Sequence, residues 1–79
     1  MLFATVFIDG KEQKGYAGEG WSFSEAINDI AYRAQGMAHT IHDLVEQYPN
    51  NKILAKVQLS DTPHFETFSS EDIKRFCAK

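Results

Sequence analysis

The longest regular pattern in this sequence is a helical one, between Ser22 and Tyr48. Its apolar residues recur in steps of four and three, which is the spacing of one face of an α-helix. Because the stripe keeps its phase across Gly36, we favour one helix over residues 22–48, with Gly36 as the position where it could bend or break. A helix of about seven turns needs the remaining short segments to cover its apolar face. The residues of the stripe are Phe23, Ile27, Ile30, Ala34, Met37, Ile41, Leu44 and Tyr48.

The segment before this helix predicts a β-hairpin. Leu2–Ile8 is rich in β-branched and aromatic residues, and it has apolar side chains on both faces of the strand. Asp9 and Gly10 follow at once, a dipeptide that suits the two positive-φ positions of a type I′ turn. The return strand, over residues 11–17, is polar and rich in glycine toward its end. We therefore expect an edge strand with a bulge.

The segments after the helix predict two more strands and a short helix. Residues 52–59 read as a strand with one apolar face, and residues 64–68 as a short fourth strand. Ser69 is placed to cap a C-terminal helix, with Phe68 and Ile73 at the positions of a hydrophobic staple. The order β-β-α-β-β-α predicts an α+β fold in a single domain over residues 1–79. We expect an antiparallel sheet of three or four strands, with one long helix packed across one face and a short C-terminal helix.

Composition and charge favour some classes of protein over others. The content of 43% hydrophobic and 24% charged residues is that of an ordinary globular domain. The formal net charge of −3 argues against nucleic-acid binding, which usually requires a basic patch. Cys77 is the only cysteine, which excludes an internal disulfide. No apolar run resembles a membrane span or a signal peptide, so we expect a cytoplasmic protein without membrane attachment.

No catalytic constellation is recognisable in the sequence. Cys77 falls in the last turn of the predicted C-terminal helix, where the helix dipole disfavours a thiolate. Several of the serines lie at expected helix caps, and no pair of carboxylates stands out as an acid–base couple. We therefore expect that the protein is not an enzyme and needs no cofactor.

Four polar residues on the predicted helix are a candidate metal site. His39, His42, Asp43 and Glu46 would be neighbours through i,i+3 and i,i+4 spacings, on the side opposite the apolar stripe. Imidazole and carboxylate groups are a plausible ligand set for zinc or a similar divalent ion. The alternative is a solvated helix face with local ion pairs. We favour this alternative, because the helical zinc signature of two histidines at i,i+4 with an intervening Glu is absent.

Two aromatic residues of the first strand are a candidate interaction surface. If the even-numbered residues of Leu2–Ile8 meet the helix, Phe3 and Phe7 lie on the other face of the sheet. Exposed there, they could form a protein interface or stack the bases of single-stranded RNA. In the alternative arrangement, the C-terminal helix covers them with Ile73 and Phe76 in a second small core.

A second candidate surface for a partner is the polar side of the long helix. Tyr32, Gln35 and His39 follow the four-three spacing there and carry side chains that make specific contacts. Gly36 lies near this row, where a partner could approach the backbone closely. Trp21, at the end of a glycine-rich stretch, is either a core anchor or a partly exposed binding residue.

Local sequence around the start of the helix also carries a resemblance. Gly15 and Gly20 precede a capping box, in which Ser22 accepts a hydrogen bond from the amide of Glu25, and Ala26 follows. This run resembles the strand–glycine–Ser/Thr–x–x–Glu-Ala–helix pattern of HicB-like antitoxin domains. The residues concerned are hairpin and capping residues, so none of that family's functional residues is carried over to this chain.

These observations lead to one functional expectation and two alternatives. The chain has the character of a small acidic protein-interaction module that binds a partner protein and inhibits or modulates it. Homodimerisation is one form that such an association takes. Accessory proteins of phages and mobile elements are analogous in size and character. The alternatives are a metal-binding protein that uses the four helix residues above and a protein that binds single-stranded RNA through Phe3 and Phe7.

Overall fold

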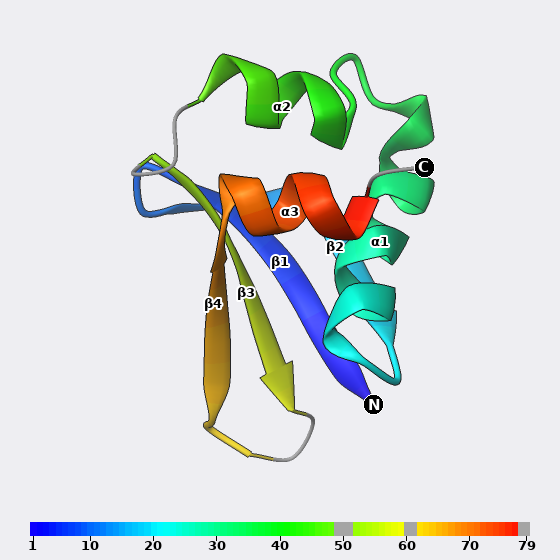
Figure 1. Cartoon of the computed structure of the whole chain (residues 1–79), viewed down its shortest axis with the longest axis vertical. Coiled ribbons are helices and arrows are strands. Elements are labelled where there is room, and N and C mark those ends of the chain that lie inside the picture. The colour runs from blue at the N-terminus through cyan, green and yellow to red at the C-terminus, as the bar shows by residue number, and fades with distance from the viewer. Residues whose placement is uncertain (49–51, 60–61, 78–79) are drawn as a thin grey trace.

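The computed structural model describes residues 1–48, 52–59 and 62–77. In these residues a four-stranded sheet carries three α-helices and one 3₁₀ turn, and the helices gather on one side of the sheet (Figure 1). None of the helices in that part of the chain is long and apolar enough to cross a membrane. The elements in chain order are β1 (Leu2–Ile8), β2 (Lys11–Gly20), α1 (Phe23–Arg33), the 3₁₀ turn η1 (Ala34–Gly36), α2 (Ile41–Gln47), β3 (Ile53–Leu59), β4 (Phe65–Ser69) and α3 (Ser70–Cys77).

The strands form an antiparallel sheet in the order β2-β1-β3-β4, which confirms the predicted fold class. β1 and β3 are central, while β2 is one edge of the sheet, as expected from its polar sequence. The φ angles of Asp9 (52°) and Gly10 (79°) are both positive, as a type I′ turn requires. The register between β1 and β2 shifts after Thr5, where residues 14–16 form the predicted bulge.

The core lies between the sheet and the helices. α1 packs on β2 and β1, and α3 packs on β3, β4 and α1. Alternate residues of β1 and β3 point into this core because the side chains of a strand alternate between its two faces. The buried hydrophobic residues are Leu2, Ala4, Val6, Tyr16, Ala26, Ile27, Ile30, Ala34, Ile41, Leu44, Val45, Ile53, Ala55, Val57, Ile73 and Cys77.

Two glycines of β2 allow α1 to pack directly against the backbone of the strand. A Cβ atom at Gly18 would lie 2.6 Å from the carbonyl oxygen of Ala26, and one at Gly20 would lie 2.7 Å from the amide nitrogen of Ala26. Both distances are far shorter than a normal contact, so a side chain at either position would push the helix away from the sheet. These glycines mark a close approach of two elements, which is one of the meanings of glycine in a strand.

The single helix expected over residues 22–48 is instead two helices. α1 continues only through η1, and after Gly36 the backbone becomes extended, with φ −79° and ψ 157° at Met37. α2 begins at a capping box of its own: Thr40 Oγ1 accepts a hydrogen bond from the amide of Asp43 (3.2 Å), and the Asp43 carboxylate accepts one from the amide of Thr40 (3.0 Å). Glycine disfavours the helix at the break, and the capping box stabilises a new start.

The predicted cap of the C-terminal helix is confirmed. Ser69 Oγ accepts a hydrogen bond from the amide of Asp72 (3.4 Å), and the Asp72 carboxylate accepts one from the amide of Ser69 (3.3 Å). Phe68, just before this cap, lies with its ring centroid 5.2 Å from that of Phe23 and 5.6 Å from that of Phe76. These ring contacts tie β4 to α1 and α3 on the helix-bearing side of the sheet.

Candidate interaction surface

The side of the sheet opposite the helices is open to solvent. The exposed fraction of the Phe3 side chain is 46%. The alternative in which the C-terminal helix covers Phe3 and Phe7 is wrong, because α3 packs beside α1, where its Ile73 is fully buried. We call this surface the open face, and its residues are Phe3, Thr5, Phe7, Leu54, Lys56, Gln58, Phe65 and Thr67 on β1, β3 and β4, with Glu12 on β2.

The strand register arranges the open face in rows that run across the sheet. Side chains that face each other on paired strands have Cβ atoms about 5 Å apart, so each row is continuous. Aromatic rings therefore border a polar centre. From β1 through β3 to β4, two rows are Phe3–Gln58–Phe65 and Thr5–Lys56–Thr67, and the third holds the pair Phe7–Leu54.

Lys56 occupies the centre of the open face. Its Nζ atom lies 4.6 Å from the ring centroid of Phe7 and 4.8 Å from that of Phe65, in cation–π contact with both. Lys56 takes part in none of the ion pairs formed among the described residues. Its positive charge is therefore available to a partner. The surrounding hollow has a volume of about 280 Å³ and is lined by Phe3, Thr5, Phe7, Glu12, Lys56, Gln58 and Phe65.

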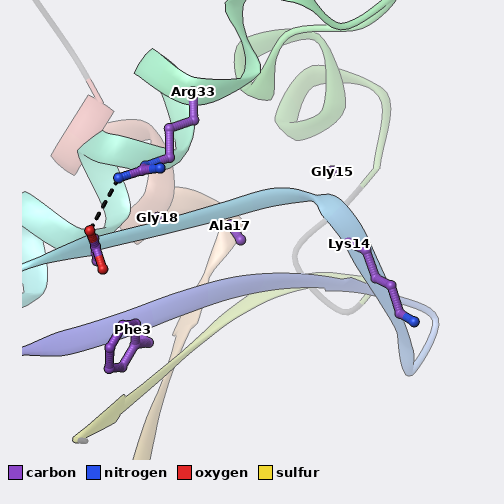
Figure 2. A pocket seen from close by; sticks show the side chains of 7 residues that line it. Phe3, Lys14, Gly15, Ala17, Gly18 and Arg33 are labelled. Atoms are coloured by element: carbon purple, nitrogen blue, oxygen red, sulfur yellow. Dashed lines mark hydrogen bonds and ion pairs between the residues drawn. The ribbon is translucent and has the colours of Figure 1, made fainter.

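A second hollow, of about 380 Å³, adjoins the open face at the edge strand β2 (Figure 2). Arg33 reaches from the end of α1 toward β2, where its Nη2 lies 3.3 Å from Glu19 Oε1 and its Nε 2.5 Å from Asp29 Oδ2. The Asp29 carboxylate also accepts a hydrogen bond from the Glu19 amide (2.9 Å). Burial alone would raise the pKa of Asp29, but these hydrogen bonds outweigh it and hold the pKa below its usual value. These ion pairs and the hydrogen bond form a network that joins α1 to β2.

The other residues predicted to bind a partner lie on the helix side of the molecule. Trp21, in the turn between β2 and α1, is 75% exposed, and Tyr32 on α1 is 72% exposed. Gln35, Gly36 and His39 are exposed in η1 and in the segment that follows it. Because the helix ends before His39, the expected continuous row does not form. The structure thus separates the predicted partner residues into the open face and the helix side.

The structure does not bring the four residues of the candidate metal site together as one ligand set. His39 precedes the N-cap of α2, so its helical spacing to Asp43 is lost. Asp43 caps α2, His42 Nε2 lies 3.2 Å from a backbone carbonyl oxygen of α3, and Glu46 lies 3.8 Å from a lysine of α3. Within the described part of the chain, no group of three or more His, Cys, Asp or Glu side chains is arranged to hold a metal ion.

Two titratable side chains of the core are held in their neutral forms. Burial raises the pKa of the Cys77 thiol, which opposes formation of a nucleophilic thiolate. The Tyr16 hydroxyl donates a hydrogen bond to the carbonyl oxygen of His39. Burial, and then the negative charge of Asp43, raise the pKa of Tyr16. Both groups contribute to packing. The hydrogen bond of Tyr16 holds the segment between α1 and α2 against β2, and Cys77 packs into the core from the last turn of α3.

The interpretation of the sequence missed Phe65 and Lys56 as parts of the surface. A signal for Phe65 was present, because alternation within residues 64–68 places it opposite Phe68, the residue expected in the staple. Lys56 was assigned to the polar face of its strand together with Leu54. Its place between two aromatic strands depends on the strand order, which the sequence does not determine.

Comparison with known proteins assigns no family to the chain. No protein-family model matches it, and neither the curated proteins nor the solved structures give a match. The likeness to HicB-like antitoxin domains remains a local pattern. Its residues have local tasks here: Gly20 permits close packing of α1, Ser22 caps α1, and Glu25 accepts a hydrogen bond from the amide of Trp21. The observations that bear on function are therefore those of the surface itself.

Proposed function

We propose that this chain is a non-enzymatic protein-interaction module whose open face is a protein–protein interface. The supporting observation is the cluster of rings on that face, where Phe3 and Phe65 are 46% and 48% exposed and Phe7 is half-buried. Aromatic residues are enriched at interfaces and among the residues that dominate binding energy. A cluster around one hollow on an otherwise uncovered sheet differs from the scattered apolar residues of an ordinary surface.

The second part of the proposal concerns what binding does to the partner protein. We place the chain among small accessory proteins, of the type that phages and mobile elements carry, which inhibit or modulate the protein they bind in the cytoplasm. This part rests on analogy alone, in size and in acidic character, with a formal net charge of −3.

In-cell cross-linking followed by mass spectrometry tests the proposal in the native host. The wild-type chain is compared with a Phe3→Ser/Phe65→Ser variant, whose altered side chains project from the surface and should leave the fold intact. We expect at least one protein, which can be the chain itself, to cross-link to the wild type and to fall by about tenfold or more with the variant. A Trp21→Ser/Tyr32→Ser variant on the helix side is the matched control. If the open-face variant retains every cross-linked protein, the open face is not an interface and the proposal fails.

Single-stranded RNA binding is a second candidate function, favoured by Lys56. A basic group among exposed aromatic rings on an open sheet is the combination that stacks bases and meets phosphates, although the net charge of −3 weighs against it. Titration with fluorescent single-stranded oligonucleotides at low salt decides the matter. Salt-sensitive binding that Lys56→Ala weakens supports this function, and the absence of binding by the wild-type chain rejects it.

A further inference from the structure

We infer that the protein that covers the open face is a second copy of this chain, packed sheet to sheet. The inference rests on the proposed function and names its partner. β1 carries apolar side chains on both faces, with Val6 in the core and Phe3 and Phe7 on the open face. A strand of this composition is typical of a sheet that is covered on both sides. Two sheets pack about 10 Å apart with interdigitating side chains, and a second copy supplies a sheet of matching width.

The charges of the open face are self-complementary. Glu12 and Lys56 line the same hollow. Neither has an ion-pair partner within the residues that the structure describes. In a two-fold dimer, a contact between Lys56 of one copy and Glu12 of the other is automatically repeated in reverse. An occupant that carries only one sign of charge would leave either Glu12 or Lys56 unpaired at the interface, where an unpaired charge is costly.

The size of the open face suits a reversible dimer. Four strands spaced about 4.8 Å apart, with about six residues each, give a face of roughly 400 Å² in projection. Two copies would therefore bury on the order of 1,000 Å² of accessible surface, at the lower limit for a specific protein–protein interface. We expect a dimer whose population depends on protein concentration, and not an obligate one.

This arrangement leaves the helix side of both copies exposed. The three helices lie on the opposite side of the sheet from the open face (Figure 1). Trp21 and Tyr32 therefore remain accessible on the outer surfaces of the dimer.

Charge reversal tests the dimer directly by sedimentation velocity over a series of concentrations. We expect the wild-type chain to pass from monomer to dimer. Lys56→Glu alone places two acidic groups opposite each other, and Glu12→Lys alone places two basic groups opposite each other, so each variant should weaken self-association by about tenfold or more. An equimolar mixture of the two variants restores both opposite-charge contacts, and it should form a heterodimer near the wild-type affinity. Circular dichroism and melting temperature confirm that each variant is folded.

The outcomes separate this inference from the proposed function. A wild-type chain that stays monomeric throughout, single variants that dimerise as well as the wild type, or a mixture that stays monomeric each overturns the dimer through the Glu12–Lys56 contact. If the chain is monomeric and the cross-linking experiment finds another protein that depends on Phe3 and Phe65, the proposed function stands with a different partner. If those substitutions leave both self-association and cross-linking unchanged, both proposals fail. The Phe3→Ser/Phe65→Ser variant also tests dimerisation independently of charge.

Discussion

At Gly18 the absence of a side chain decides how closely α1 approaches the sheet. A Cβ atom there would lie 2.6 Å from the carbonyl oxygen of Ala26 and 2.6 Å from the amide nitrogen of Ile30, both of them backbone atoms of a packed helix. We expect Gly18→Ala to lower the free energy of unfolding by about 2 kcal/mol or more. Gly36→Ala is the matched control, because a Cβ at Gly36 meets nothing within 4 Å, and it should change stability by less than about 1 kcal/mol. Urea denaturation of both variants measures the difference, and equal effects would contradict the packing argument.

Also at the residue scale, Asp29 links stability to pH. Its pKa is lowered from the ordinary value of 3.8: burial acts against this shift, and the hydrogen bonds from Arg33 and from the Glu19 amide outweigh it. A carboxyl group with a depressed pKa in the folded state stabilises the fold above the unfolded pKa, and this contribution is lost as the pH falls through the folded pKa.

Asp29→Asn therefore has a pH-dependent effect. We expect the free energy of unfolding to fall by about 1 kcal/mol at neutral pH. The difference from the wild type should shrink as the pH falls below 3.8 and through the lower pKa of the folded state, because the wild-type carboxyl then becomes neutral, as the Asn side chain is at every pH. Asn28→Gln is the control, since Asn28 is exposed on the same helix and carries no charge. Thermal melts across the acid range check this, and a pH-independent difference would show that the charge of Asp29 is not responsible.

At the scale of the element, the stability of α2 depends on the capping box at its N-terminus. Its seven residues are too few for a helix that is stable by itself. Thr40→Ala should cost about 1 kcal/mol of stability, because it removes the side chain that accepts from the Asp43 amide. Thr40→Ala/Asp43→Ala should cost less than the two single changes together, since both act on one capping box. Gln47→Ala, at the exposed end of α2, is the control. Strict additivity in denaturation experiments would contradict a shared cap.

The secondary-structure elements also show which features of the fold the sequence predicts and which it does not. Strands, hairpin turn, bulge and the caps of α1 and α3 were predictable because each depends on neighbours along the chain. The break between α1 and α2 was not, because Ile41 re-enters the core and so keeps the apolar period across a change of backbone direction. Thr40 and Asp43 carried the missing signal of a new helix start. For the surface, Phe3 was predictable from alternation along one strand, whereas the approach of Phe65 required the strand order, which is set by contacts distant in sequence.

At the scale of the whole molecule, stability should decrease from the central strands to α2. β1 and β3 are paired on both edges and bear the core, whereas α2 packs mainly on α3 and α1 and lies away from the sheet (Figure 1). Native-state hydrogen exchange should therefore show the amides of Val6 and Val57 opening only with global unfolding, and those of Leu44 and Val45 opening at a lower free energy. Thr40→Ala should lower the opening free energy of α2 and that of the central strands by about the same amount, because the cap is lost in both openings. If the amides of α2 exchange with the same opening free energy as those of β1, the molecule unfolds as one unit and α2 does not open separately.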